Sequence, residues 1–108
     1  MTQEYEEAAH RIAEAKRVIA VTGAGASVES GIPDFRSEGG IWSKYPPHEY
    51  ATIDAFLSNP VKVWGLWFEL GAMMQGVKPN AGHYALAELE QLGRLHAGIT
   101  LNIDNLRQ

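Results

Sequence analysis

The chain has 108 residues, 45% of them hydrophobic and 20% charged, which predicts one globular domain or part of a larger one. Its formal net charge of −4 gives no electrostatic reason to expect nucleic acid or an anionic membrane as a partner. The absence of cysteine excludes a disulfide framework and a thiolate metal site within these residues, and it fits a cytoplasmic protein. No stretch resembles a signal peptide or approaches the ~18 apolar residues of a membrane span.

Residues 4–16 are predicted to form a helix. Tyr5, Ala8 and Ile12 recur at helical spacing. Acidic residues lie near the start of this segment and basic residues lie further on, an order that complements the helix dipole. We interpret the acidic start as a solvated face rather than as a site for a partner.

A glycine-containing turn follows the first predicted strand. The short apolar run 18–22 is predicted to be a buried strand. In the turn 23–27, two glycines allow the backbone to bend sharply and to approach a bound group. A helix that begins at about Ala26 would point free N–H groups at that group, which suits a phosphate. Gly31 is expected to end this helix, and Pro33 prevents its continuation.

A polar triplet opens a long connecting segment. Asp34, Phe35 and Arg36 are predicted to lie on a loop, where an acid, a ring and a guanidinium are more typical of ligand contacts than of a core. Residues 37–47 contain many turn formers and little periodicity, so we predict a long loop. Loops of this length often form lids or binding segments, and the two adjacent glycines within it would supply a hinge.

Helices are predicted over the next part of the chain. Residues 52–57 suit a short helix, and Asn59 and Pro60 are a typical N-cap and first residue for a second helix that Gly76 ends. A stripe of apolar, mostly bulky residues recurs on one side of this second helix: Val63, Trp64, Trp67, Phe68, Gly71 and Met74. We interpret this stripe first as core packing and second as the wall of a pocket for an apolar group.

A further helix and a second strand complete the chain. Asn80 is the expected N-cap of a helix over 81–92 that stops at a glycine. The residues expected to face inward on it are Tyr84, Ala85, Leu89 and Leu92. The strand predicted over 95–101 leads into Asn102 and Asp104. Ligands of open α/β sheets bind at the carboxyl ends of the strands, so these two side chains should approach the same crevice as the glycine turn.

The glycine turn alone is a weak sign of a dinucleotide site. The usual fingerprint has a third small residue where this chain has Val28, and an acid about 20 residues further on, at the end of the next strand. Here the next predicted strand comes only after the helices. No Gly-Lys-Ser/Thr follows the turn either, so a P-loop and an ordinary hydride-transfer oxidoreductase are both poor matches.

Longer motifs are more specific. Residues 23–37, GAGASVESGIPDFRS, resemble the glycine motif of the sirtuins, the NAD-dependent protein deacylases. Residues 39–42, GGIW, are similar to the family's next signature. A third family motif is similar to residues 79–89, which contain Pro-Asn and a later His-x-Ala-Leu-x-Glu-Leu. A fourth is similar to residues 100–106, which contain Asn-Ile-Asp-Asn. The four motifs follow the family's order and cover nearly the whole chain.

The resemblance implies an α/β fold. It implies a Rossmann-like open parallel sheet, present here as its N-terminal half, with a helical insertion between the first two strands. Residues 1–108 would then be the N-terminal part of an NAD-binding catalytic domain. No separate zinc module is expected within the chain, and zinc would bind only in a downstream segment. Because so small a sheet leaves an edge open, we expect an exposed edge or another chain that covers it.

The resemblance also implies a set of cofactor-binding residues. They are Gly23, Ala24, Gly25, Ala26, Ser27, Asp34, Phe35, Arg36, Asn102, Ile103 and Asp104. The first five would cradle the pyrophosphate of NAD, the next three would border the nicotinamide and ribose, and the last three would form the nicotinamide pocket. These residue types suit the task, since they offer backbone donors for phosphate, an acid and an amide for sugar or carboxamide, and a ring that excludes water.

The implied reaction releases nicotinamide and transfers the acyl group of a modified lysine to ADP-ribose. The acyl oxygen attacks the ribose carbon that carries nicotinamide, so the site must stabilise an oxocarbenium-like sugar and guide a weak nucleophile. An acyl-lysine protein or peptide is therefore the expected partner. Asn102 and Asp104 would assist the reaction, whereas the family's general-base histidine would lie beyond Gln108.

The chain departs from the family pattern at several positions. Leu101 stands where glutamine is usual and cannot hydrogen-bond a ribose, and Arg107 stands where histidine is common. The chain's own histidines are expected to be surface or capping residues: His10, His48, His83 and His96. We therefore expect these 108 residues, as a piece of a longer sirtuin or as a short product, to bind NAD weakly and not to deacylate.

The sequence leaves several functions open. One alternative is a module that binds NAD or ADP-ribose without catalysis, and a second is a mono-ADP-ribosyl transferase; an oxidoreductase is the least favoured.

The sequence also narrows the kind of acyl group that the substrate lysine would carry. Sirtuins that prefer succinyl- or malonyl-lysine carry a tyrosine and an arginine on the helix that follows Asn59, but residues 63–77 contain neither Lys nor Arg. Acetyl or a longer fatty acyl group is therefore favoured over an acidic one.

Overall fold

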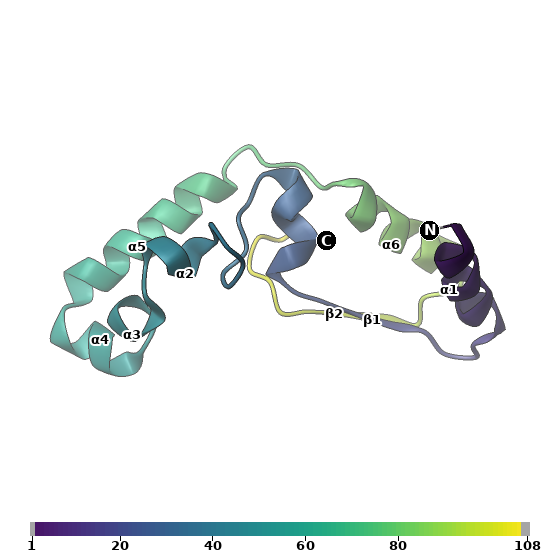
Figure 1. Ribbon diagram of the computed structural model, residues 1–108, viewed down its shortest axis with the longest axis horizontal. Helices are drawn as coiled ribbons and strands as arrows, with labels where there is room; N and C mark the ends of the chain where they lie inside the picture. Colours follow the sequence, from purple (N-terminus) through teal and green to yellow (C-terminus); the bar gives the residue numbers. More distant parts are fainter. Residues whose placement is uncertain (1, 107–108) are drawn as a thin grey trace.

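Two parallel strands lie at the centre of the molecule, between two groups of helices (Figure 1). The computed structural model describes residues 2–106, so Arg107 lies outside the described part of the chain. The elements in chain order are α1 (Thr2–Glu14), β1 (Ile19–Thr22), the 3₁₀ helix η1 (Ala24–Ser30), α2 (Ile41–Lys44), α3 (Pro47–Tyr50), α4 (Ile53–Ser58), α5 (Pro60–Met74), α6 (Ala81–Gln91) and β2 (Ala97–Thr100). None of the helices within residues 2–106 is both long and apolar enough to cross a membrane.

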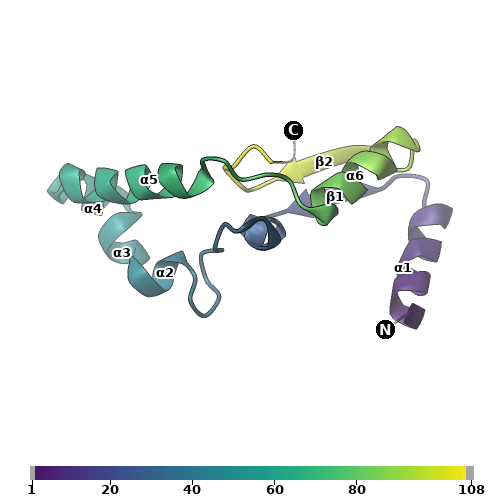
Figure 2. The ribbon, with the colours of Figure 1, turned by 90° about the horizontal axis from the view of Figure 1, so that it is seen from above.

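The strands pair directly and in parallel. Ile19 lies opposite Ala97, and Thr22 lies opposite Thr100. In the chain, every helix except α1 lies between the two strands. Figure 2, which shows the molecule from above, shows helices α2–α5 apart from the strand pair and α6. The predicted α/β fold, with an open parallel sheet and a helical insertion between its first two strands, is therefore confirmed.

The prediction that the first strand is buried was wrong. The side chains of Ile19 and Val21 are 54% and 63% exposed, and only the alternate residues of β1 are half-buried. Every residue of β2 is exposed as well. An apolar β-branched run predicts a strand because of its local conformation, but burial depends on elements that cover the sheet. Within residues 2–106 neither face of β2 is covered.

The helix after the glycine turn begins earlier than predicted. It is the 3₁₀ helix η1, which starts at Ala24 rather than at about Ala26. Gly23 is the extended residue before it, and the N–H of Ala26 donates to the Gly23 carbonyl at 3.1 Å. Gly31 ends η1 with φ of 99°, a left-handed conformation that glycine adopts without strain. The predicted stop at this glycine is confirmed.

Helices α2 and α5 share a small core, and part of the predicted loop 37–47 belongs to it. Ile41, Leu66 and Leu70 are buried together. Ile41 begins α2, and its N–H donates to the carbonyl of Asp34 at 2.8 Å. The long loop was therefore predicted wrongly over α2, because a four-residue helix is too short to show helical periodicity.

The core-facing stripe on α5 was predicted correctly at Val63 and Met74 but wrongly at the aromatic residues Trp64, Trp67 and Phe68. Val63, Leu66 and Leu70 are the buried residues of this helix. Trp64 and Phe68 are 52% and 75% exposed, and their rings lie 6.0 Å apart on the outer side. Helices α3 and α4 pack against α5, while the rings of Trp64 and Phe68 are turned to solvent.

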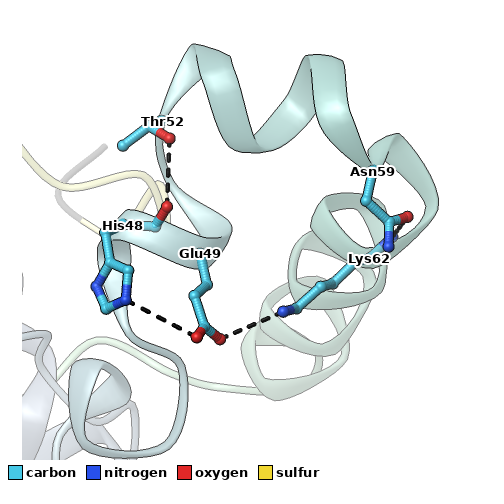
Figure 3. Close-up of polar contacts among 5 residues, drawn as sticks. All are labelled: His48, Glu49, Thr52, Asn59 and Lys62. Carbon is cyan, nitrogen blue, oxygen red and sulfur yellow. Dashed lines mark hydrogen bonds and ion pairs between the residues drawn. The ribbon is translucent and has the colours of Figure 1, made fainter.

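Polar contacts join α3, α4 and α5 (Figure 3). Glu49 pairs with Lys62 at 3.2 Å, and His48 lies 3.8 Å from the same carboxylate. Thr52 caps α4, and Asn59 caps α5 by accepting from the N–H of Lys62 at 3.2 Å. The predicted N-cap of α5 is confirmed. The ion pair is partly exposed, so it contributes at most about 1 kcal/mol to stability.

Helix α6 has the predicted cap but a different inward face. Asn80 accepts from the N–H of His83 at 3.2 Å, and Nδ1 of His83 accepts from the N–H of Asn80 at 3.1 Å, which forms a capping box. His83 is buried and Leu89 half-buried, whereas Tyr84 and Leu92 are exposed, as is Ala85. The predicted inward face is therefore confirmed only at Leu89.

Candidate functional site

The site lies where both strands end. Because β1 and β2 are parallel, their carboxyl ends share one edge of the sheet, and the N–H of Leu101 donates to the Thr22 carbonyl there at 2.8 Å. The glycine turn continues from β1, and residues 101–104 continue from β2. The structure thus brings the two predicted halves of the site together from opposite ends of the chain.

An open cavity of about 420 Å³ occupies this edge. Its walls are formed by Gly23, Ala24, Gly25, Asp34, Phe35, Arg36 and Leu101. Apart from Leu101, all of them are among the residues that sequence reasoning assigned to cofactor binding. From the sequence, Leu101 was noted only as a departure from the family pattern. In the structure its side chain forms part of the cavity wall.

The two glycines of the turn leave the cavity open. A Cβ atom built on Gly23 or on Gly25 would meet no atom within 4 Å. Side chains at these positions would therefore not clash with the protein, but they would take up space over the backbone. Glycine leaves the N–H groups of the turn accessible to a bound molecule.

Ser27 lies below the cavity rather than in its wall. It is fully buried, and its Oγ accepts from Nδ2 of Asn102 at 3.0 Å. The same nitrogen donates to Oδ2 of Asp104 at 2.6 Å. The N–H of Ile103 donates to Oδ1 of Asn102 at 3.0 Å. These bonds lock the segment that follows β2 against the glycine turn.

Ala26 also lies outside the cavity lining. Its carbonyl accepts from Nδ2 of Asn80 at 2.7 Å. Sequence reasoning identified Asn80 only as a helix cap and missed this contact. No local pattern could reveal it, because the two residues are far apart in the chain and meet only in the folded structure.

Asp34 is held in place by the loop that follows it. Its carboxylate accepts from the backbone N–H of Ser37 at 3.1 Å and from the Ser37 hydroxyl. A Cβ atom on Gly40 would lie 2.8 Å from the Asp34 carbonyl, so only glycine allows this close approach. Arg36 is exposed, and among residues 2–106 its guanidinium makes no ion pair.

A second, largely apolar cavity of about 490 Å³ shares residues with the first. Phe35 and Leu101 line both spaces. The walls of the second also include Trp42, Phe56, Trp67 and Ile103. The rings of Phe35 and Trp42 lie 5.0 Å apart. The interpretation of the α5 stripe as a pocket wall thus fits Val63 and Trp67, which line this cavity, whereas Trp64 and Phe68 line a separate, open apolar pocket of about 600 Å³.

The histidines stay apart from both cavities. His10, His48 and His96 are exposed, and Nε2 of His10 lies 3.3 Å from Glu14. His83 serves in the cap of α6. These placements confirm the prediction of surface and capping histidines. Within residues 2–106, no group of three or more His, Asp or Glu side chains could hold a metal ion.

Comparison with known proteins gives a consistent result. The model of the Sir2 family matches residues 23–108. An NAD-dependent protein deacylase of Thermococcus sibiricus is 52% identical over 103 residues, which make up 95% of this chain and 40% of that protein. The chain therefore spans about 40% of the length of this curated relative.

Solved structures agree in fold. A structure from work on the mechanism and regulation of Sir2 enzymes is 47% identical and superposes with a TM-score of 0.91, over 100% of this chain and 42% of that one. A complex of a Sir2 homologue with NAD is 45% identical, with a TM-score of 0.82, over 94% of this chain and 40% of that one.

Proposed function

The chain belongs to the Sir2 family, the sirtuins, and we propose that it supplies the NAD-binding part of a protein-lysine deacylase. Residues 1–108 would be the N-terminal part of the catalytic domain, without a zinc module of their own. The observation that carries this proposal is the cavity in which the glycine turn meets Asp34, Phe35 and Arg36.

The walls of this cavity fit NAD chemically. The accessible backbone of Gly23 and Gly25 and the free guanidinium of Arg36 suit the negatively charged diphosphate. The carboxylate of Asp34 suits sugar hydroxyls, and the ring of Phe35 suits the flat nicotinamide. NAD, when bound, supplies the ADP-ribosyl group that accepts the acyl group as nicotinamide leaves.

The chain's own side chains would orient the reactants and exclude water. Phe35 lies between the two cavities, where it would shield the sugar from water after nicotinamide departs. Asn102 is fixed by Ser27 and Asp104, so its amide would stay in one orientation beside the site. Such orientation in advance of binding lowers the barrier without any movement during the reaction.

The second cavity is proposed to receive the acyl-lysine of a protein or peptide. Aromatic and aliphatic side chains predominate in its walls, and neither Lys nor Arg is among its lining residues within the described part of the chain. On α5, Glu69 carries a negative charge that pairs with Lys44 at 3.1 Å. An acetyl or longer fatty acyl group would be favoured, because a succinyl carboxylate would find no cation there.

Two titrations test these proposals. Calorimetric titration of the chain with NAD should show binding, and the absence of binding at millimolar NAD would contradict the proposed function.

In the second titration, with NAD present, the fluorescence of Trp42 and Trp67 should change when a peptide binds. An acetyl-lysine peptide should bind more tightly than the matching succinyl-lysine peptide, and the reverse order would contradict the proposed acyl preference.

A module that binds NAD or ADP-ribose without catalysis is the second candidate. The observation that favours it is Leu101, an apolar side chain at the wall where the family pattern has glutamine. An assay for nicotinamide release with an acetyl-lysine peptide separates the two candidates when it is run on a protein of the relatives' full length, because the 108 residues alone are expected not to deacylate. Release would support a catalytic protein, and labelling of the peptide with ADP-ribose instead of loss of its acetyl group would indicate a mono-ADP-ribosyl transferase.

The exposed strands favour a covering partner. Ile19, Val21 and Ile99 present exposed apolar side chains on the face of the sheet, a surface that another chain could cover. Amide exchange in β1 and β2, measured at increasing protein concentration, tests for a second copy. Protection that rises with concentration supports such self-association, and protection that stays constant contradicts it.

A further inference from the structure

Asn80 connects the start of α6 to the glycine turn. Its side-chain oxygen accepts from the N–H of His83 at 3.2 Å, which caps the helix. Its side-chain nitrogen donates to the carbonyl of Ala26 at 2.7 Å. Both ends of one short, rigid amide are therefore bonded, and each bond fixes the orientation that the other requires.

The amide is itself held by the helix. The N–H of Asn80 donates to Nδ1 of His83 at 3.1 Å, so the backbone and the side chain of Asn80 are both tied to the first turn of α6. The His83 side chain is buried, whereas the bond from Asn80 to the Ala26 carbonyl lies at the surface. The Asn80 side chain thus reaches the turn from a fixed base rather than from a mobile linker.

The carbonyl of Ala26, which accepts the bond from Asn80, lies next to other contacts that fix the turn. Ala26 precedes the buried Ser27, whose hydroxyl accepts from Asn102. Ala26 also donates its N–H to the carbonyl of Gly23 at 3.1 Å. Asn80 and Asn102 therefore hold adjacent residues of the turn from two different parts of the chain, while residues 23–25 face the open cavity between β1 and these anchors.

We propose that Asn80 is a positioning residue for the glycine turn, through its bond to the Ala26 carbonyl. It would hold the N–H groups of the turn in the orientation that a bound diphosphate requires, and the consequence for binding rests on the function proposed above. A turn ordered before binding avoids the entropic cost of ordering it on binding. A helix cap alone requires only the oxygen of the asparagine, and the nitrogen provides the second role.

Asn80→Ser separates the two roles. A serine hydroxyl caps a helix about as well as asparagine does, but it is too short to reach Ala26. Asn80→Asp likewise keeps a capping oxygen and loses the donor. Asn59→Ser is the matched control, because Asn59 caps α5 through the N–H of Lys62 at 3.2 Å and lies in the other group of helices.

Amide hydrogen exchange gives the first measurement and does not depend on NAD. In both Asn80 variants, the amides of residues 25–29 should exchange about three- to tenfold faster, the change expected for loss of one hydrogen bond, while the amides of α6 stay protected. Asn59→Ser should leave the turn unchanged. Unchanged exchange in the turn overturns the proposal, and so does a loss of protection that extends through α6.

NAD affinity gives the second measurement. Asn80→Ser should weaken NAD binding about three- to tenfold, with the unfolding midpoint close to that of Asn59→Ser. Equal affinity of Asn80→Ser and the unmodified chain would overturn the binding consequence. If the unmodified chain does not bind NAD, the proposed function fails, whereas the exchange measurement still decides whether Asn80 positions the turn.

Discussion

The hydroxyl of Ser27 and the side-chain amide of Asn102 meet at 3.0 Å, at the end of the sheet where both parallel strands terminate. Ser27 is fully buried, and Asn102 is also bonded to Asp104. This contact joins the segment after β1 to the segment after β2. It is the direct connection between the two halves of the candidate site.

Ser27→Ala should therefore destabilise the fold. Loss of one buried hydrogen bond costs about 1 kcal/mol of unfolding free energy, and the remaining bond from Asn102 to Asp104 keeps the loss from growing much larger. Denaturant unfolding measures the change. Ser58→Ala, at the exposed end of α4, is the control and should change stability little. Equal stability of the two variants would show that the Ser27 contact is unimportant.

Gly25→Ala should separate binding from stability. A Cβ at this position meets no protein atom, and alanine favours a helix over glycine by roughly 0.5–1 kcal/mol, so the fold should be as stable as before or more stable. NAD affinity should fall about tenfold, because the methyl group takes space over the backbone. Gly71→Ala on α5, which also meets no atom, should gain stability without losing affinity. A Gly25→Ala variant that binds NAD normally would contradict this account of the cavity.

Leu101→Gln should strengthen NAD binding. The side chain at this position is 77% exposed and lines the cavity, so glutamine adds hydrogen-bonding groups at the wall without disturbing a core. One added hydrogen bond would raise affinity about three- to tenfold, as calorimetry can measure. Leu57→Gln, an equally exposed change on α4, should have no effect. No gain in affinity would indicate that the ligand does not reach this wall.

Gly40→Ala should disturb the loop that holds Asp34. A Cβ there would lie 2.8 Å from the carbonyl and from the carboxylate of Asp34, so the loop must shift. Overpacking of this kind costs about 1–3 kcal/mol, which thermal or denaturant unfolding would detect. Gly65→Ala on α5, where a Cβ meets nothing, provides the comparison. A Gly40→Ala variant as stable as Gly65→Ala would contradict the close approach.

Local signals predicted the helix caps well. Asn59 and Asn80 cap the helices for which they were named, and Gly31 adopts the left-handed conformation that ends η1, whereas α5 ends at the extended Gln75, one residue before Gly76. These features depend on a few neighbouring residues, so a single sequence contains the necessary information. The edge of the sheet was predicted for a different reason, since parallel strands place their carboxyl ends together whatever lies between them.

Burial and long-range contacts could not be predicted in the same way. The periodicity of α5 was read correctly, but which side faces the core depends on where α3 and α4 pack, and Trp64 therefore lies outside. The burial of Ile19 could not be predicted either, because the sequence of a strand does not specify which elements cover its side chains. The bond from Asn80 to Ala26 follows only from the folded arrangement of segments that are distant in the chain.

The pairing of Ile19 with Ala97 has a consequence for the order of folding. The helices α3, α4 and α5 contact one another over short stretches of sequence, so they require little loop closure and should form early. The pairing of Ile19 with Ala97 closes a loop of 78 residues (97 − 19), and that entropic cost is met only when both ends come together. The candidate site, which exists only where the strands end side by side, should be among the last parts of the molecule to form.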